Sequence, residues 1–226
     1  MLISGFDKVT LLNYPGLVAC TIFTKGCNLK CPFCHNSSLI SGNDDTYIDE
    51  DEIFKYLNKR KNIIEGVCIS GGEPLLQKDI KEFIRKIKSL GLKVKLDTNG
   101  TNPDLILSLI NDNLLDYIAM DIKNIKSKYE LTSGAKEKID NILKSINIIE
   151  NSGIDYEFRT TIIKEFHTLS DIDYISKKLD KKSKYYIQNF VKSDAVLDKN
   201  LHSFTSDELK EMKQILNNEN IIFRDL

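Results

Sequence analysis

The chain has 226 residues, a mass of 25.8 kDa and a formal net charge of −1 at neutral pH. Hydrophobic residues make up 41% and charged residues 29% of the sequence, a balance typical of a globular protein that buries a sizeable core. The near-zero charge gives no general attraction to nucleic acid or to a membrane surface, and no apolar run approaches the roughly 20 residues that cross a bilayer, so we expect neither as a partner.

Short β-branched segments alternate with longer amphipathic segments along the chain. The predicted strands are 17–24, 66–70, 93–97, 116–122, 156–163 and 185–190. The predicted helices are 50–60, 79–90, 103–113, 136–151, 171–179 and 206–217. In the second of these helices Asp79 is the expected N-cap, and Gly91 follows the last turn. This alternation favours βαβ units around a mainly parallel sheet, either an open doubly wound sheet or an incomplete (β/α) barrel.

Polar or glycine-rich segments lie at the carboxyl ends of five of the predicted strands. They are SGGEP (70–74), DTNG (97–100), MDIK (120–123), RTT (159–161) and QNF (188–190). Each of them is explained, on its own, as a turn or a helix cap. Both candidate architectures, however, bring the carboxyl ends of parallel strands to one edge, where ligands bind. Together, the segments therefore predict a single functional mouth.

Cys27, Cys31 and Cys34 lie close together on the loop that follows the first predicted strand. The chain has five cysteines, an odd number, and its N-terminal segment lacks the apolar core of a signal peptide. We therefore expect a cytoplasmic protein with reduced thiols rather than a disulfide framework. The two other cysteines, Cys20 and Cys68, fall inside apolar strands and are expected to be small buried side chains.

Two kinds of metal site fit three thiols on one loop. Together with His35 they would make a Cys₃His zinc site, although the adjacent Cys34 and His35 would have difficulty pointing at one tetrahedral ion. A 4Fe–4S cluster ordinarily takes four thiolates, so three thiolates leave one iron free for another ligand. On that interpretation the missing fourth cysteine is a functional feature.

The spacing C-x₃-C-x₂-C, with the aromatic Phe33 before the third cysteine, resembles the signature of radical S-adenosylmethionine enzymes. The resemblance implies that the three cysteines ligate a 4Fe–4S cluster, and that the amino and carboxylate groups of S-adenosylmethionine chelate the fourth iron. Gly71, Gly72 and Glu73 are similar to the family's GGE motif. That motif implies glycines that admit the cofactor and a glutamate that holds its amino group.

Further motifs, YPG (14–16), CHN (34–36), DTNG and MDIK, resemble the glycyl-radical-enzyme activases, most closely the anaerobic ribonucleoside-triphosphate reductase activating proteins. The resemblance covers about residues 14–190. It implies an incomplete (β/α)₆ TIM-like barrel, mainly parallel, in a single domain over 1–226, with 191–226 as a C-terminal helical extension.

The activity implied by this resemblance is radical chemistry on a protein. Reductive cleavage of S-adenosylmethionine gives methionine and a 5′-deoxyadenosyl radical, which removes a hydrogen atom from a backbone glycine of a partner enzyme. The implied partners are that glycyl radical enzyme and an external one-electron donor such as flavodoxin or ferredoxin, in an oxygen-free cell.

The resemblance also extends to single residues at the strand ends. Asp97 and Lys123 match activase positions that contact S-adenosylmethionine, and Lys123 is expected to pair with its carboxylate. Arg159 is expected to reach the same carboxylate or the incoming glycyl loop. Asn189 is a further candidate for contact with S-adenosylmethionine, and the only reason is its position at the end of a predicted strand.

A monovalent cation beside the cofactor's carboxylate is a further implication, because some activases hold one at matching positions. Its expected ligands are Asp97, Thr98, Met120 and Asp121. We expect His35 and Asn36 to shape the cysteine loop rather than to bind metal, and we assign no role to His167 or His202.

Three other functions remain open from the sequence. A compact radical enzyme acting on a small molecule, such as a 7-carboxy-7-deazaguanine synthase, would have a closed substrate pocket in place of an open lateral cleft. A pyruvate formate-lyase-type activase shares most of the same motifs. A zinc-stabilised binding module without catalysis would contain zinc in place of iron and sulfide.

Overall fold

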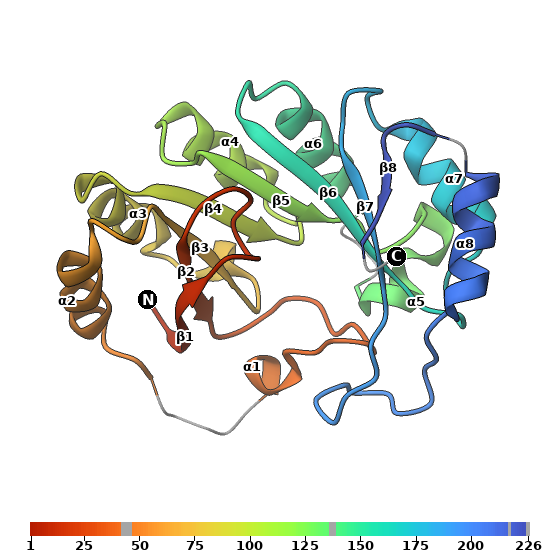
Figure 1. The fold of residues 1–226 in the computed structure, drawn as a ribbon, viewed down its shortest axis with the longest axis horizontal. Helices are drawn as coiled ribbons and strands as arrows, with labels where there is room; N and C mark the ends of the chain where they lie inside the picture. Colours follow the sequence, from red (N-terminus) through yellow and green to blue (C-terminus); the bar gives the residue numbers. More distant parts are fainter. Residues whose placement is uncertain (42–46, 136–138, 217, 225–226) are drawn as a thin grey trace.

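The computed structural model describes residues 1–41, 47–135, 139–216 and 218–224. In these residues eight strands form one sheet whose spatial order follows the order of the chain (Figure 1). The strands are β1 (Ile3–Thr10), β2 (Ala19–Thr24), β3 (Gly66–Gly71), β4 (Lys93–Thr98), β5 (Tyr117–Asp121), β6 (Asp155–Ile162), β7 (Tyr185–Asn189) and β8 (Ile221–Phe223). β1 and β2 are antiparallel, and every later pair is parallel. Since the outer strands β1 and β8 do not pair with each other, the sheet curves without closing.

The longer helices lie around the outside of this curved sheet (Figure 1). The helices are α1 (Ser37–Ser41), α2 (Glu50–Arg60), α3 (Ile80–Ser89), α4 (Pro103–Asn111), α5 (Tyr129–Ser133), α6 (Ile139–Glu150), α7 (Leu169–Lys178) and α8 (Ser206–Ile215), with 3₁₀ turns η1 (Pro74–Leu76) and η2 (Lys126–Lys128). Within the described ranges, no helix combines the length and the apolar character that crossing a membrane requires.

The predicted fold class is confirmed, because the six predicted strands correspond to β2 through β7 and the sheet is an incomplete barrel. The six predicted helices correspond to α2, α3, α4, α6, α7 and α8. Residues 136–138 and 217, at the ends of two of these predictions, lie outside the described residues. The two outer strands were not predicted, so the segment 191–226 contains β8 as well as helix α8.

Helix α3 shows how the sequence pattern produces this arrangement. Ile80, Phe83, Ile84 and Ile87 recur at helical spacing and are all buried in the core against the sheet. The helix ends before Gly91, which takes the left-handed conformation with φ of 79°. The prediction for Asp79 was wrong in one respect. It occupies the N-cap position, but its carboxylate makes no capping hydrogen bond and instead accepts one from the amino group of Met1, at 2.7 Å.

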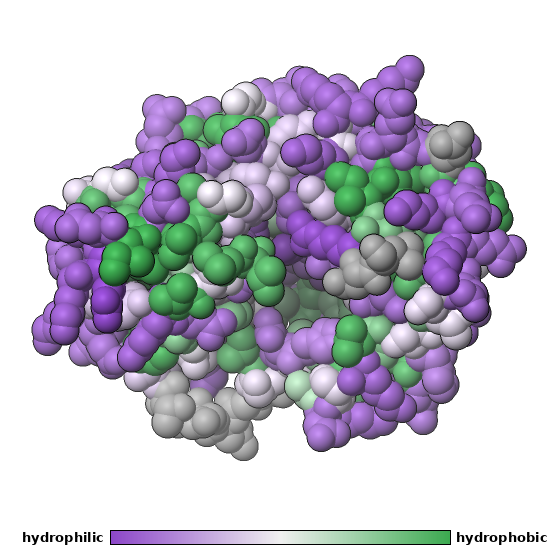
Figure 2. Space-filling view, in the orientation of Figure 1, coloured by the Kyte–Doolittle hydropathy of each residue, from purple (hydrophilic) through white to green (hydrophobic). Residues whose placement is uncertain are grey.

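The two faces of the sheet differ in polarity. In β4, Val94 and Leu96 pack into the apolar core that the sheet shares with the helices, whereas the alternate residue Lys95 pairs with Asp97 on the opposite, inner face. In β6, Glu157 is also buried on the inner face. In the space-filling view this side of the molecule has a hollow near its middle, partly lined by hydrophilic side chains and flanked by hydrophobic patches (Figure 2). The incomplete barrel therefore has a charged interior.

Candidate active site

A cavity of about 270 Å³ lies at the carboxyl ends of the strands, where the sequence predicts a functional mouth. It is enclosed by the loop after β2 and by residues at the ends of β3 through β7. The predicted site residues that line it are Cys27, Cys31, Phe33, Cys34, Gly71, Gly72, Asp97, Thr98, Asp121, Lys123 and Arg159. Residues far apart in the sequence therefore meet in one place. Glu73, Met120 and Asn189 are not among the lining residues.

The three thiols of this cavity are free and partly shielded from water. Burial raises the pKa of each above the ordinary cysteine value, and that of Cys31 reaches about 11. The thiols also affect one another, because a charge on Cys34 raises the pKa of both Cys27 and Cys31. The ammonium of Lys123 acts in the opposite direction on all three. It therefore favours the thiolate form that a metal cluster needs.

The arrangement of these thiols distinguishes between the two metal sites that the sequence leaves open. Among the described residues, no three His, Cys, Asp or Glu side chains are grouped so as to hold a single metal ion. His35 lines the same cavity, but its Nε2 is already occupied, 2.6 Å from the backbone carbonyl of Val191. Three free thiols that line one cavity supply the number of protein ligands of a 4Fe–4S cluster that keeps one iron open.

The cysteine loop is held in place by segments from distant parts of the chain. Leu29 and Phe33 are buried in a small apolar cluster whose other buried members are Cys31, Ile163, Phe190, Val196 and Leu201. The backbone N–H of Lys30 donates to the carbonyl of Ser133 at 2.9 Å, and that of Asp198 donates to the carbonyl of Pro32 at 2.9 Å. The sequence motif therefore needs most of the fold to fix its geometry.

The glycines of the GGE segment allow β3 to approach the cysteine loop closely. A Cβ atom on Gly72 would lie 2.0 Å from the carbonyl oxygen of Gly26, the residue before Cys27. A Cβ on Gly71, whose φ is 114°, would lie 2.3 Å from the backbone nitrogen of Thr24. The sequence interpretation, in which the glycines make room for the cofactor, stays a prediction, and the structure adds a second role. They make room for the backbone that carries the cluster ligands.

Glu73 lies behind the cavity wall and links two of the motifs. It is 1% exposed, and its carboxylate accepts hydrogen bonds from the backbone of Leu75 at 3.1 Å, the hydroxyl of Thr98 at 2.8 Å and the backbone of Asn99 at 2.7 Å. Because these donors come from the protein itself, Glu73 ties the end of β3 to the end of β4. Its predicted contact with the cofactor's amino group stays a prediction.

The buried carboxyl of Glu73 gives the cofactor-free protein a specific pH dependence. Burial raises its pKa to about 7, against an ordinary value of 4.5, although the hydrogen bonds from Asn99, Thr98 and Leu75 oppose the shift. The folded state therefore holds this proton more tightly than the unfolded state. The stabilisation it provides is complete below pH 4.5 and is lost as the pH rises through 7.

We expect the free energy of unfolding of the wild type to fall by about 3 kcal/mol, relative to Glu73→Gln, between pH 4.5 and 7.5. Urea unfolding of both proteins at several pH values in this range, without metal or cofactor, measures the difference. The contributions of the other titrating groups cancel because both proteins contain them. Parallel curves for the two proteins would contradict the assignment.

A chain of charged side chains crosses the cavity from β4 to the loop after β5. Lys95 pairs with Asp97, Arg159 donates from Nη1 to Asp97 at 3.3 Å and from Nε to Asp121 at 2.8 Å, and Lys123 donates to Asp121 at 2.9 Å. Burial, the largest single effect, opposes charging of both carboxyls, but Arg159 and the lysines together outweigh it and hold the pKa of Asp97 and Asp121 below their ordinary values. Both carboxylates are therefore ionised at neutral pH and share three cations.

This network bears on the predicted cation site. Asp97 and Asp121 already have cationic partners, and the hydroxyl of Thr98 donates to Glu73. The side chain of Met120 is buried in the apolar core, against Gly100. The site stays a prediction, and a monovalent cation would have to compete with the ammonium and guanidinium groups that surround the two carboxylates.

Asn189 has a structural role that its position in the sequence does not reveal. Its amide donates to the carbonyl of Phe204 at 2.8 Å and accepts from the backbone N–H of the same residue at 3.1 Å. It therefore fixes the segment before α8. Gln188, the preceding residue, is the one that lines the cavity.

Two residues that the sequence analysis did not assign to the site also support it: Asn99, which lines the cavity, and His167, which lies outside its lining. His167 accepts a hydrogen bond at Nδ1 from the backbone of Ile163 and lies 2.8 Å through Nε2 from the carbonyl of Lys123, so the neutral ring donates to the segment that carries this lysine. Asn99 lies 3.9 Å from the sulfur of Cys27 and donates to Asn28 at 2.9 Å. The DTNG motif could have identified Asn99, whereas nothing around His167 in the sequence singles it out.

Comparisons with known proteins agree with this site. Residues 21–175 match the family model described as "Radical SAM superfamily". A protein of Methanocaldococcus jannaschii, named "Putative glycyl-radical enzyme activating enzyme", is 34% identical over 234 residues, which cover 100% of this chain and 96% of that protein. The pyruvate formate-lyase-activating enzyme of Listeria monocytogenes is 34% identical over 141 residues, or 57% of this chain and 56% of the relative.

Solved structures show the same fold. Streptococcus suis SuiB bound to precursor peptide SuiA matches with a TM-score of 0.70 at 16% identity, covering 90% of this chain and 48% of that chain. This chain thus spans about half the length of SuiB, and the likeness shows a shared fold alone.

Members of the matched family are enzymes that use a 4Fe–4S cluster and S-adenosylmethionine, and the three free thiols beside an open cavity fit that pair of cofactors. The match covers more than half of the chain, and the M. jannaschii relative aligns over 96% of its own length. The chain belongs to the radical S-adenosylmethionine superfamily.

Proposed function

We propose that this enzyme activates a glycyl radical enzyme, and that its partner is an anaerobic ribonucleoside-triphosphate reductase. The observation that carries the proposal is the alignment with the M. jannaschii relative, which leaves almost no part of either chain unmatched. The pyruvate formate-lyase-activating enzyme of Clostridium pasteurianum also aligns, with 27% identity over 78% of this chain. The choice of the reductase as partner rests on the YPG, CHN, DTNG and MDIK motifs.

In this proposal Cys27, Cys31 and Cys34 hold the 4Fe–4S cluster, and the open side of the cavity receives S-adenosylmethionine. When bound, the two cofactors supply reductive cleavage of a carbon–sulfur bond and a 5′-deoxyadenosyl radical that abstracts hydrogen. An external one-electron donor such as flavodoxin or ferredoxin provides the electron. The protein itself orients the cofactor, keeps water out and admits the glycine.

Arg159 and Lys123 are the groups best placed to hold the carboxylate of S-adenosylmethionine. Arg159 uses Nε and Nη1 for Asp121 and Asp97, so within the described part of the chain its Nη2 remains available. Lys123 uses one N–H for Asp121, and its ammonium lies 5.9 Å from the centre of the Phe33 ring, beside the cysteine loop. A carboxylate entering from the open side would meet both cations.

The open barrel suits a substrate presented on a protein loop. The sheet ends at β1 on one side and at β8 on the other, without pairing between them. A backbone glycine has no side chain, so its α-carbon can approach a reactive group closely if the loop that carries it has room to enter. An incomplete barrel provides that room, whereas an enzyme for a small molecule would close around its substrate.

The test follows the abstracted hydrogen. We expect slow formation of 5′-deoxyadenosine with reductant alone and faster formation when the reductase, or a peptide of its glycine loop, is added under anaerobic conditions. Deuterium at the α-carbon of that glycine is expected to appear in the 5′-deoxyadenosine, which mass spectrometry detects, and a glycyl radical is expected in the electron paramagnetic resonance spectrum.

Two other results would replace the proposal. If deuterium is transferred from the glycine of pyruvate formate-lyase but not from that of the reductase, the partner is pyruvate formate-lyase. If no glycine transfers label and a pterin-like small molecule is turned over, a deazaguanine-type activity takes the place of the activase.

A further inference from the structure

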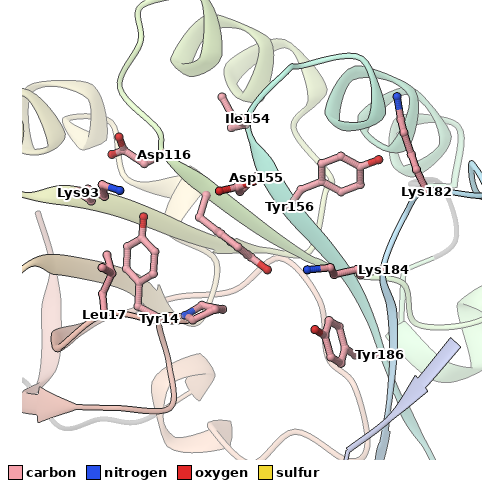
Figure 3. A pocket seen from close by; sticks show the side chains of 12 residues that line it. Tyr14, Leu17, Lys93, Asp116, Ile154, Asp155, Tyr156, Lys182, Lys184 and Tyr186 are labelled. Atoms are coloured by element: carbon pink, nitrogen blue, oxygen red, sulfur yellow. The ribbon is translucent and has the colours of Figure 1, made fainter. Parts of the chain in front are cut away.

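A second cavity lies at the opposite end of the strands from the cysteines. Its volume is about 460 Å³, larger than the 270 Å³ of the candidate active site. Tyr14 and Pro15 of the YPG motif form one wall, and residues at the starts of β4 through β7 form the remainder (Figure 3). A space of this size accommodates a small molecule of roughly nucleotide dimensions. The function proposed above gives neither this cavity nor the YPG motif a role.

Tyrosine rings supply the apolar surface of this cavity. Tyr14, Tyr117, Tyr156 and Tyr186 all line it. The rings of Tyr14 and Tyr117 stand edge to face with centroids 6.0 Å apart, and the guanidinium of Arg224 lies 4.0 Å from the centre of the Tyr186 ring. These contacts fix the rings in place. Fixed aromatic faces and edges suit a flat, ring-shaped ligand.

Two ammonium groups reach the same space from opposite walls. Lys93 lies beside Tyr14 on one wall, and the side chain of Lys184 extends from the other wall toward the middle, whereas Lys182 points away (Figure 3). None of the three side chains has an ion pair or hydrogen bond with any residue that the structure describes. Cations that converge on a cavity without protein partners attract an anion, and phosphate is the common biological one.

Two carboxylates in the cavity limit which anion fits. Asp116 is already neutralised, because Lys88 donates to it at 2.7 Å and the backbone of Val94 donates at 2.7 Å. Asp155 has no partner among the described residues and is exposed at the start of β6. A carboxylate beside a phosphate is unfavourable unless the same ligand brings hydrogen-bond donors to it. Ribose hydroxyls are donors of this kind.

We propose that this cavity binds a nucleoside diphosphate or triphosphate. Its base lies against the tyrosine rings, Asp155 accepts hydrogen bonds from the ribose, and Lys93 and Lys184 hold the phosphates. The proposal explains why a tyrosine and a proline of the YPG motif lie far from the cysteines. It does not depend on the reaction at the other end of the barrel, so either proposal can fail without the other.

The test is isothermal titration of adenosine diphosphate into the anaerobic holoenzyme, with its cluster loaded and S-adenosylmethionine at saturation. Saturation keeps the adenine ring of the probe out of the cofactor site. We expect one equivalent to bind. The double variant Lys93→Ala/Lys184→Ala is expected to weaken binding at least ~tenfold through loss of charge-assisted hydrogen bonds, whereas Lys182→Ala, the matched control, changes affinity less than about twofold.

Two further probes check the parts of the ligand. Adenosine and pyrophosphate are each expected to bind at least ~tenfold more weakly than adenosine diphosphate, because each satisfies only part of the cavity. Absence of binding at millimolar adenosine diphosphate overturns the proposal. Pyrophosphate binding as tightly as the nucleotide would show an anion site that does not use the rings. Equal losses in the lysine double variant and Lys182→Ala would contradict direct phosphate contacts by Lys93 and Lys184 and overturn the proposal. Thermal melting of each variant confirms that it is folded, as expected for exposed lysines.

Discussion

Replacing Cys31 by alanine is expected to abolish iron binding by the reconstituted protein. Cys31 is 7% exposed, lines the candidate active site with Cys27 and Cys34, and lies on a loop fixed by distant segments. With three protein thiolates, a 4Fe–4S cluster already lacks one ligand, so the loss of a second leaves two irons without protein attachment. Iron and sulfide analysis after anaerobic reconstitution, with the brown absorbance of the cluster, measures the effect. Cys27→Ala and Cys34→Ala are expected to behave in the same way.

The other two cysteines provide the matched controls. Cys20 and Cys68 are fully buried within β2 and β3, and neither lines the cavity. Cys20→Ala and Cys68→Ala are expected to lower stability by about 1 kcal/mol and to keep the full iron content. The ligand assignment is wrong if Cys20→Ala, while folded, loses as much iron as Cys31→Ala. Retention of zinc by the wild type in place of iron would restore the zinc-module interpretation.

Gly72→Ala is expected to have the second largest effect, a loss of at least about 3 kcal/mol of unfolding free energy together with poor iron loading. The added Cβ would lie 2.0 Å from the carbonyl oxygen of Gly26, and neither backbone can move without displacing Cys27. The φ of Gly72 lies outside the left-handed region, so the clash alone produces the effect. Urea unfolding of the apoprotein measures the first loss and iron analysis the second.

Gly91→Ala is the control for this prediction. Gly91 also follows an element end, but a Cβ there meets open space, and only its φ of 79° opposes substitution. We expect a cost of roughly 1–2 kcal/mol and unchanged iron loading. Equal behaviour of the two variants would show that the close approach of β3 to the cysteine loop does not matter.

The central strands and helices were predictable because their sequences carry strong local patterns. α3 buries an unbroken apolar stripe, and β3 is a short apolar run bounded by glycines. β1 has no such pattern, since Gly5 and Asp7 interrupt a segment in which only Ile3 is fully buried. β8 has only three residues, Ile221–Phe223, and becomes a strand because β7 offers it a parallel edge. Tertiary context, which no sequence window contains, decides such segments.

The cavity could be predicted because the carboxyl ends of parallel strands lie at the same edge of the sheet. Residues at the ends of different strands are therefore close in space, even when they are far apart in the sequence. The direction of each side chain could not be predicted in the same way. Glu73 follows a strand end, yet its carboxylate faces Thr98 and Asn99, and Asn189 faces Phe204. Arg224, which pairs with the buried Glu157 at 2.9 Å, lies far beyond the motifs. Side-chain partners of this kind depend on packing rather than on spacing.

The spatial order of the strands is the same as their order in the chain, and this affects how the protein can fold during its synthesis. Each new strand from β2 onward adds to the edge left by the one before it, so the sheet can grow while the ribosome is still translating. The cysteine loop is translated early, but Ser133, Val191 and Asp198, which fix it, are translated much later. For most of translation the nascent chain therefore contains the three thiols without the contacts that fix the cysteine loop. We expect the cluster to be inserted only after roughly the last hundred residues have left the ribosome.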